Sequence, residues 1–190
     1  MAQAKTLNAA ELKQVLSYIA VNRHALRNRV MLLITHWSGM RVGEVAALKY
    51  CDVLGADGKV LAEVRLSGEM TKGNHARTVF FPERLRKEVQ AYVNAYPCHS
   101  PSYPLFYTQK SALFGFSANT LCQLFFHSYR RAHMPGASSH SGRRTFITNL
   151  AGKGIGVRVL QSLAGHRNIG TTQAYIDVND EMKRRAVELI

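Results

Sequence analysis

Two segments in the first half of the chain place a basic side chain where it can reach a phosphate. Arg41 follows the glycine turn at Gly39 and opens an expected helix, so its guanidinium can donate to an oxyanion while Glu44, one turn later, orients it. Lys72 lies in the polar segment 71–77, where a lysine can reach a neighbouring groove and act as a proton donor. Taken singly, the first segment also fits a surface ion pair, and the second an ordinary solvated turn.

Two segments in the second half supply histidine, arginine and tyrosine. His140 and Arg143 are three residues apart, so on a helix they point the same way, which suits phosphate binding combined with proton transfer. His166 and Tyr175 both lie in the segment 163–175. A tyrosine can act as a nucleophile where cations stabilise its phenolate. The simpler interpretations are a basic helix face on nucleic acid and a tyrosine that packs.

Helices must position most of these residues, because apolar side chains recur at helical spacing in both halves of the chain. The β-favouring runs 59–66 and 77–81 predict two or three short antiparallel strands, joined by a loop that carries Lys72. The sequence therefore predicts an α+β fold that is mainly helical, with a small antiparallel sheet. The first expected helix begins at Asn8, which forms a capping-box pattern with Glu11. The other expected helices cover about 25–37, 42–48, 85–96, 117–125, 140–150, 157–163 and 180–190.

The charge of the chain narrows the choice of partner. Its 190 residues include 25 Lys and Arg against 12 Asp and Glu, a formal net charge of +13. That excess favours a polyanion, with nucleic acid first and an anionic membrane surface second. No apolar run approaches the ~20 residues of a membrane span. The histidines and the three cysteines lack the spacing of a metal site or a disulfide framework, so we expect a cytoplasmic domain with no bound metal.

In chain order the candidate residues are Arg, Lys, His-x-x-Arg, His and Tyr, an order that resembles the tyrosine recombinase (phage integrase) family. Residues 39–45 resemble its first arginine box, Lys72 its β-hairpin lysine, and residues 140–143 its His-x-x-Arg box. Residues 163–175 resemble its last box, with one additional residue, Ala164, between the leucine and the glycine. The resemblance covers nearly the whole chain and implies the helical catalytic domain of that family.

The resemblance also implies a reaction. Tyr175 would attack phosphorus and form a 3′-phosphotyrosine bond, while Arg41 and Arg143 would stabilise the charge on the non-bridging oxygens. Lys72 would protonate the 5′-oxygen that leaves. Because side chains supply the cations and the covalent bond keeps the energy of the phosphodiester, no metal, ATP or other cofactor is expected.

The remaining site residues receive supporting roles from the same resemblance. His140 would assist proton transfer at Tyr175, His166 would bind a non-bridging oxygen, and Glu44 would hold Arg41. Gly142 stands where the family often has a larger apolar residue, and Arg144 where it often has histidine, but neither departure removes a catalytic group. The expected contacts with the DNA backbone are Arg77, Arg144 and Thr171.

Partners and organisation follow from the family as well. Double-stranded DNA at specific sites is the expected partner, bound by a homotetramer that is a monomer or weak oligomer when free, with an accessory DNA-bending protein as a further candidate. We expect residues 1–190 to form one catalytic domain without the N-terminal core-binding domain that most members carry, in a bacterial or phage-encoded protein at the nucleoid. Either a short one-domain protein or a catalytic fragment of a longer one fits the sequence. The expected C-terminal helix, 179–190, either docks on a neighbouring protomer or packs on its own domain.

Three other functions remain open from the sequence. A type IB topoisomerase-like enzyme would share the catalytic residue types and relax supercoiled DNA without a specific site. A basic DNA-binding regulator would keep the fold and lose the reaction, although all six catalytic candidates are present. A basic RNA-binding protein would leave the four segments unexplained.

Overall fold

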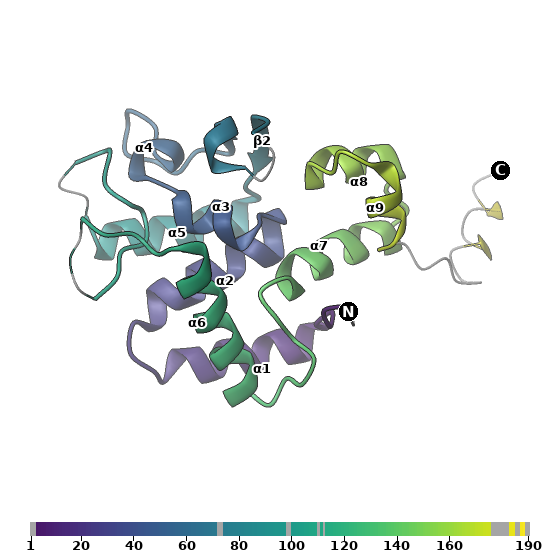
Figure 1. The fold of residues 1–190 in the computed structure, drawn as a ribbon, viewed down its shortest axis with the longest axis horizontal. Coiled ribbons are helices and arrows are strands. Elements are labelled where there is room, and N and C mark those ends of the chain that lie inside the picture. Colours follow the sequence, from purple (N-terminus) through teal and green to yellow (C-terminus); the bar gives the residue numbers. More distant parts are fainter. Residues whose placement is uncertain are drawn as a thin grey trace.

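The computed structural model describes residues 3–71, 74–97, 100–109, 111, 113–175, 183–184 and 187–188. Over these residues the chain is mainly helical with a two-stranded antiparallel sheet, which confirms the predicted fold class (Figure 1). In chain order the elements are α1 (Ala9–Ala20), α2 (Ala25–Ser38), α3 (Val42–Ala47), α4 (Tyr50–Val53), β1 (Glu63–Leu66), the 3-10 turn η1 (Gly68–Met70), β2 (Arg77–Phe80), α5 (Glu83–Ala95), α6 (Ala118–Arg131), α7 (Ser141–Gly152), α8 (Val157–Ala164) and α9 (Ile169–Gln173).

The first helix begins as its capping pattern predicts. The Glu11 amide donates to the Asn8 side chain at 2.9 Å, and the Asn8 amide donates to the Glu11 carboxylate at 3.0 Å. Two orphan amides at the helix start are thereby satisfied. Val15 and Ile19 are buried on the inner face of α1, so the apolar spacing that predicted the helix also marks the side that meets the core.

Helix α2 runs through the core, and its residues from Val30 to Ile34 are fully buried because α1, α5 and α7 pack around it. It ends at Gly39, as predicted, with a left-handed φ of 69°. A Cβ at Gly39 would lie 2.5 Å from the ring of Phe146 in α7. The glycine therefore ends the helix and also lets α7 approach the turn that precedes Arg41.

The sheet has two strands, the smaller of the two predicted numbers, and its first strand is shorter than predicted. Strands β1 and β2 pair antiparallel, with Val64 opposite Val79, and both of these side chains are buried. The expected first strand, 59–66, forms only from Glu63 onward because Val60 pairs in an isolated bridge with Leu54, and its amide donates to the Gln90 side chain at 3.0 Å. The described residues hold two strands and not three.

Two short helices are absent from the predictions. Helices α4 and α9 span only four and five residues, which is too short for apolar periodicity to reveal them. Side-chain caps stabilise both: Asp52 accepts from the Lys49 amide at 2.8 Å, and Asn168 accepts from the Gly170 amide at 2.8 Å.

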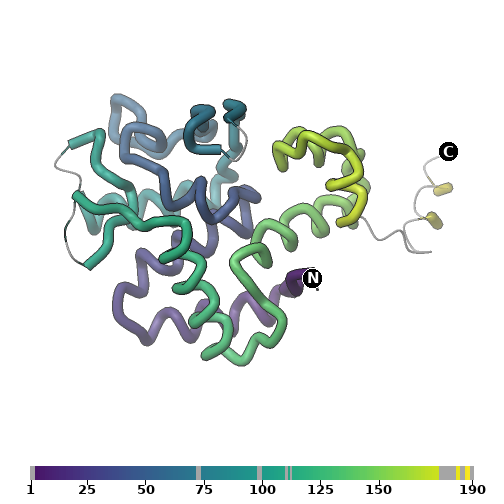
Figure 2. Tube along the Cα trace, viewed as in Figure 1, coloured from purple at the N-terminus to yellow at the C-terminus, as the bar shows by residue number. Residues whose placement is uncertain are grey.

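The last three helices, α7 to α9, lead away from the core and then return toward β2. Helix α7 leads away from the core, and α8 and α9 lie opposite α3 and β2 (Figures 1 and 2). Arg77 of β2 joins the two sides by donating to the Leu163 carbonyl of α8 at 2.8 Å. The predicted C-terminal helix, 179–190, falls mostly outside the described residues. Within the described ranges, no helix has both the length and the apolarity needed to cross a bilayer.

Candidate active site

A buried carboxylate organises one side of the site. Glu44 in α3 is 1% exposed and accepts hydrogen bonds from two arginines: Arg41 at 2.9 Å and Arg77 at 2.7 Å. It also accepts from the Arg41 amide at 2.8 Å, which fixes the start of α3. The expected Arg41–Glu44 pair is therefore not a surface ion pair, because Glu44 lies in the interior and links two elements.

A third guanidinium lies beside this group. Arg143 in α7 is 5% exposed, donates to the Gly39 carbonyl at 2.7 Å, and also donates to the Ala164 carbonyl. Arg41 donates to the next carbonyl along, that of Gly165, at 3.1 Å. The two arginines thus converge on consecutive residues of one turn, at the end of α8.

The electrostatics of the group favour an anion. Burial raises the cost of ionising Glu44, but the hydrogen bonds and charges of Arg77 and Arg41 outweigh it and hold the pKa of Glu44 below its usual range. Burial, followed by the charges of Arg41 and Arg77, lowers the pKa of Arg143 to about 9, so its guanidinium stays charged at neutral pH. Three guanidiniums thus surround one carboxylate, and their excess of positive charge suits a phosphate.

The three arginines differ in how much of their hydrogen-bonding capacity the protein uses. Arg77 donates through Nε, Nη1 and Nη2, all to Glu44 or to the Leu163 carbonyl. In the part of the chain that the structure describes, Arg41 and Arg143 each make only two side-chain hydrogen bonds of a possible five. Arg41 and Arg143 therefore keep donors for a ligand, whereas Arg77 is committed to holding Glu44.

His166 directly follows Ala164 and Gly165, whose carbonyls accept hydrogen bonds from Arg143 and Arg41. Its Nδ1 lies 2.9 Å from the hydroxyl of Thr172, a fully buried residue of α9. Burial, and then the charges of Arg143 and Arg41, lower the pKa of His166 to about 4. The imidazole is therefore neutral at pH 7, and the Thr172 contact on Nδ1 leaves Nε2 for a ligand.

Tyr175 stands beside His166 at the edge of the domain. The two rings are stacked, with centroids 5.8 Å apart and an interplanar angle of 17°. The Arg144 guanidinium lies over the tyrosine ring at 5.8 Å, and the Thr148 hydroxyl donates to the Tyr175 carbonyl at 3.5 Å. The phenol also acts electrostatically on Arg143, so the tyrosine belongs to the same local field as the arginines.

A cavity of about 470 Å³ opens beside the tyrosine. His140, Arg144, Thr171 and Tyr175 all contribute to its walls. The Nε of Arg144 is buried and has no hydrogen-bond partner among the described residues, which leaves this donor for a ligand. Both Arg144 and Thr171, which were expected to contact the DNA backbone, thus line the cavity next to Tyr175.

Two of the predicted site residues need separate comment. Lys72 lies outside the described residues, so its position is not part of this geometry. His140 is the N-cap residue of α7 and is exposed, whereas Arg143, three residues later, is buried.

Sequence reasoning missed two features of the site. Thr172 was not singled out, although the Thr171-Thr172 pair lies within the last box and is the signal that would have pointed to it. Arg77 was interpreted as a DNA contact, but its side chain is 10% exposed and is bound to Glu44. Spacing along the chain cannot reveal such a contact, because the two residues are 33 positions apart.

The sequence of the chain matches a known protein family and several of its members. Residues 5–182 match the sequence model of the Phage integrase family. Tyrosine recombinase XerA of Thermococcus kodakarensis is 31% identical over 184 residues, which cover 97% of this chain and 62% of that protein. The chain spans about three fifths of the length of the XerA proteins that it matches.

Solved structures show the same fold. A crystal structure of XerA recombinase superposes with a TM-score of 0.76 at 20% identity, covering 100% of this chain and 66% of that one. A structure of XerH site-specific recombinase bound to its palindromic difH substrate gives a TM-score of 0.72 at 22% identity, covering 96% of this chain and 51% of that one.

Proposed function

This chain belongs to the phage integrase family, and from that membership we propose that it cleaves and rejoins DNA strands in site-specific recombination, with Tyr175 as the nucleophile. The observation that carries the proposal is the turn 163–166. Arg41 and Arg143 donate to consecutive carbonyls of this turn, and His166 follows them and stacks on Tyr175. The phosphate-binding donors and the nucleophile are thus tied to one short segment.

In the proposed cleavage step, the Tyr175 oxygen attacks phosphorus as its proton leaves. A bond forms between the phenolic oxygen and phosphorus, and the bond from phosphorus to the 5′-oxygen breaks. His140 lines the same cavity as Tyr175 and is the group we assign to proton transfer at the phenol. We assign protonation of the departing 5′-oxygen to Lys72 on the basis of its place in the family motif.

Charge on the non-bridging oxygens would be stabilised by the free donors of Arg41 and Arg143. Both guanidiniums are held by other contacts before the substrate arrives, so little reorganisation is needed at the moment of reaction. His166, neutral at pH 7, would donate from Nε2 to one of these oxygens. The reverse attack by a 5′-hydroxyl would release Tyr175 and rejoin a strand, which needs no metal or ATP.

Double-stranded DNA is the partner that we propose, held at specific sites. The formal net charge of +13 supplies affinity for phosphates that does not depend on sequence and that weakens with salt. Strand exchange needs two sites, so we propose that four protomers assemble on paired DNA and that the free chain is a monomer or weak oligomer. The segment 179–190 is our candidate for contact between neighbours.

A suicide DNA substrate tests the reaction. The chain is incubated, with a chelator present, with attachment-site DNA nicked next to the cleavage position, so that the covalent intermediate is trapped. We expect an adduct that resists denaturation in the unaltered chain and in Tyr103→Phe, a matched control that removes a phenol elsewhere. Tyr175→Phe should form none.

The outcomes separate the remaining functions. Tight DNA binding without an adduct would overturn the proposed reaction and favour a DNA-binding regulator. An adduct on any supercoiled plasmid, together with relaxation and no dependence on sequence, would favour the topoisomerase-like activity instead.

A further inference from the structure

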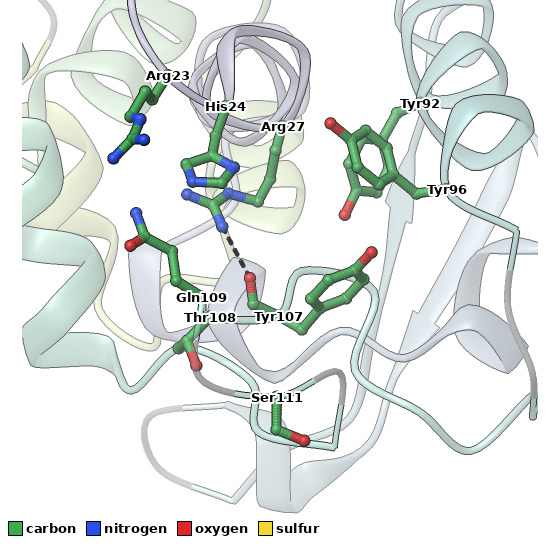
Figure 3. Close-up of a pocket in the computed structure, with 9 residues that line it drawn as sticks. All are labelled: Arg23, His24, Arg27, Tyr92, Tyr96, Tyr107, Thr108, Gln109 and Ser111. Atoms are coloured by element: carbon green, nitrogen blue, oxygen red, sulfur yellow. Dashed lines mark hydrogen bonds between the residues drawn. The ribbon is translucent and has the colours of Figure 1, made fainter.

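A second basic site lies at the opposite end of α2 from the arginine group. Two adjoining cavities share Arg23, His24, Arg27 and Gln109, and we call them together the α2 groove. The larger one has a volume of about 490 Å³, within the range of small-molecule sites (Figure 3). Helix α2 has 14 residues, so the groove lies roughly 20 Å from Gly39 along the helix axis.

Arg27 lines both cavities and has no acidic partner among the described residues. Arg27 is only 6% exposed, and its side chain donates to the Tyr107 carbonyl at 2.9 Å and to the Asn28 side chain at 3.2 Å. Phe116 lies against the guanidinium at 4.9 Å. Buried charges in proteins are normally paired with an opposite charge. Among the described residues no carboxylate forms an ion pair with Arg27, so its charge is left for a ligand to neutralise.

The other charged or titratable side chains on the groove walls, tyrosines apart, are also basic. Arg23 and His24 stand with Arg27 on one side, and Arg131 and His127 extend the lining along α6. No Asp or Glu contributes to either cavity among the residues that the structure describes. Burial, and then the charges of Arg27 and Arg23, lower the pKa of His24.

The backbone at His24 is strained. His24 is the N-cap of α2 and adopts a left-handed φ of 59°. Its ring makes no cap hydrogen bond and lines the groove (Figure 3). A residue other than glycine in this conformation carries strain of about 1 kcal/mol or more, which is typical of ligand sites. The first amides of α2 also lie at this end, where the helix dipole favours an anion.

The opposite wall is aromatic. Tyr92, Tyr96 and Tyr107 line it, with Tyr92 fully buried behind the other two and Tyr96 and Tyr107 arranged edge to face at 6.4 Å (Figure 3). Thr108 lies beside Gln109, away from Tyr92 and Tyr96, and its hydroxyl is buried and has no hydrogen-bond partner among the described residues (Figure 3). Flat aromatic walls beside a cluster of cations are the combination that holds a base and its phosphate.

We propose that the α2 groove binds a nucleoside phosphate, with the phosphate on Arg23 and Arg27 and the base against the tyrosine rings. The chemistry is the same for a free mononucleotide and for the 5′-phosphorylated end of a single strand. The site is separate from Tyr175 and does not depend on the recombination chemistry, so it stands or falls independently of the proposed function.

Calorimetric titration with AMP tests the proposal. We expect saturable binding that Arg23→Ala combined with Arg131→Ala weakens about tenfold, the effect of losing charged hydrogen bonds. Arg158→Ala, a matched change at an exposed arginine outside the groove, should leave the affinity unaltered. Tyr107→Leu keeps the carbonyl that Arg27 needs and should abolish the preference for AMP over inorganic phosphate. All these variants change exposed or half-buried side chains, so the test does not require replacing the buried Arg27.

Two further measurements locate the site and identify the source of the ligand. Arg144→Ala, a half-buried change in the cavity beside Tyr175, should leave AMP affinity unchanged, and the Arg23 and Arg131 double variant should still form the covalent DNA adduct. Tighter binding of the dinucleotide pTpT than of AMP would support a strand end as the ligand, and the reverse order a free nucleotide. Loss of AMP binding in Arg144→Ala with retention in the double variant would overturn the proposal, as would equal binding of AMP and inorganic phosphate.

Discussion

The two sides of the candidate active site are built differently. The arginine side lies in the interior: Glu44 is 1% exposed and Arg143 is 5% exposed, and the contacts from Arg77 to Glu44 and from Arg143 to Gly39 join parts of the chain that are far apart in sequence. The tyrosine side lies at the edge. Tyr175 is half-buried. Its ring contacts His166 and Arg144, its amide donates to the Thr172 carbonyl at 3.0 Å, and its carbonyl accepts one long hydrogen bond from Thr148.

This difference divides the work of the site. The groups that would stabilise phosphate charge are fixed by folding itself, so their placement is costly to disturb. The nucleophile depends on a few weak contacts, so small changes move it at little cost to the stability of the domain. Substitutions on the first side should therefore affect folding and reaction together, and substitutions on the second mainly the reaction.

The largest effect is expected at the carboxylate of the arginine side. Glu44→Gln leaves Arg41 and Arg77 without their shared counter-charge in the interior, and it should lower the free energy of unfolding by about 3–5 kcal/mol. Urea denaturation measures the loss. Glu88→Gln is the control, because Glu88 pairs with Arg29 at a partly exposed position and should cost less than about 1 kcal/mol. Similar losses in both variants would contradict the proposed division.

A glycine beneath the arginine side gives the next largest effect. Gly142 precedes Arg143, and a Cβ there would lie 2.1 Å from the Thr35 hydroxyl oxygen, with His36 also within contact. Gly142→Ala should therefore destabilise the domain by about 1–3 kcal/mol by forcing α2 and α7 apart. Gly152→Ala, in the same helix with open space around it, should leave stability unchanged or raise it. Thermal unfolding of the two variants makes the comparison.

A smaller effect is expected on the tyrosine side. Thr172→Val removes the hydroxyl that contacts Nδ1 of His166 and should cost about 1 kcal/mol of stability, while the rate of adduct formation falls. Thr171→Val changes the exposed neighbouring threonine and should leave stability unaltered. An adduct rate unaffected by Thr172→Val would show that the His166 ring is oriented by its stacking on Tyr175 alone.

The last prediction concerns the charge of His166 and the pH dependence of stability. Its folded pKa of about 4 lies below the ordinary value of 6.5, so between these pH values the unfolded chain binds a proton that the folded chain does not. The contribution of His166 to stability is therefore full above pH 6.5 and is lost as the pH falls toward 4. NMR titration of the imidazole should give a midpoint near 4. A midpoint near 6.5 would mean that neither burial nor the charges of the arginine side act on His166.

Much of the local structure could be predicted from the sequence, because it depends on neighbouring residues. The capping pair Asn8 and Glu11 and the left-handed Gly39 act within a few positions, and both are where the sequence placed them. The first strand was predicted too long, because Val60 instead forms a bridge with Leu54 and donates a hydrogen bond to the side chain of Gln90, 30 residues away.

The sequence by itself determined the chemistry available: the arginines, histidines and tyrosine in family order, and the excess of positive charge. Only the tertiary structure decided how these groups are used. It buried Glu44 between Arg41 and Arg77, exposed His140 while burying Arg143, and lowered the pKa of His166. Each of these outcomes depends on distances between residues far apart in the chain and on how completely water is excluded, and residue order carries neither.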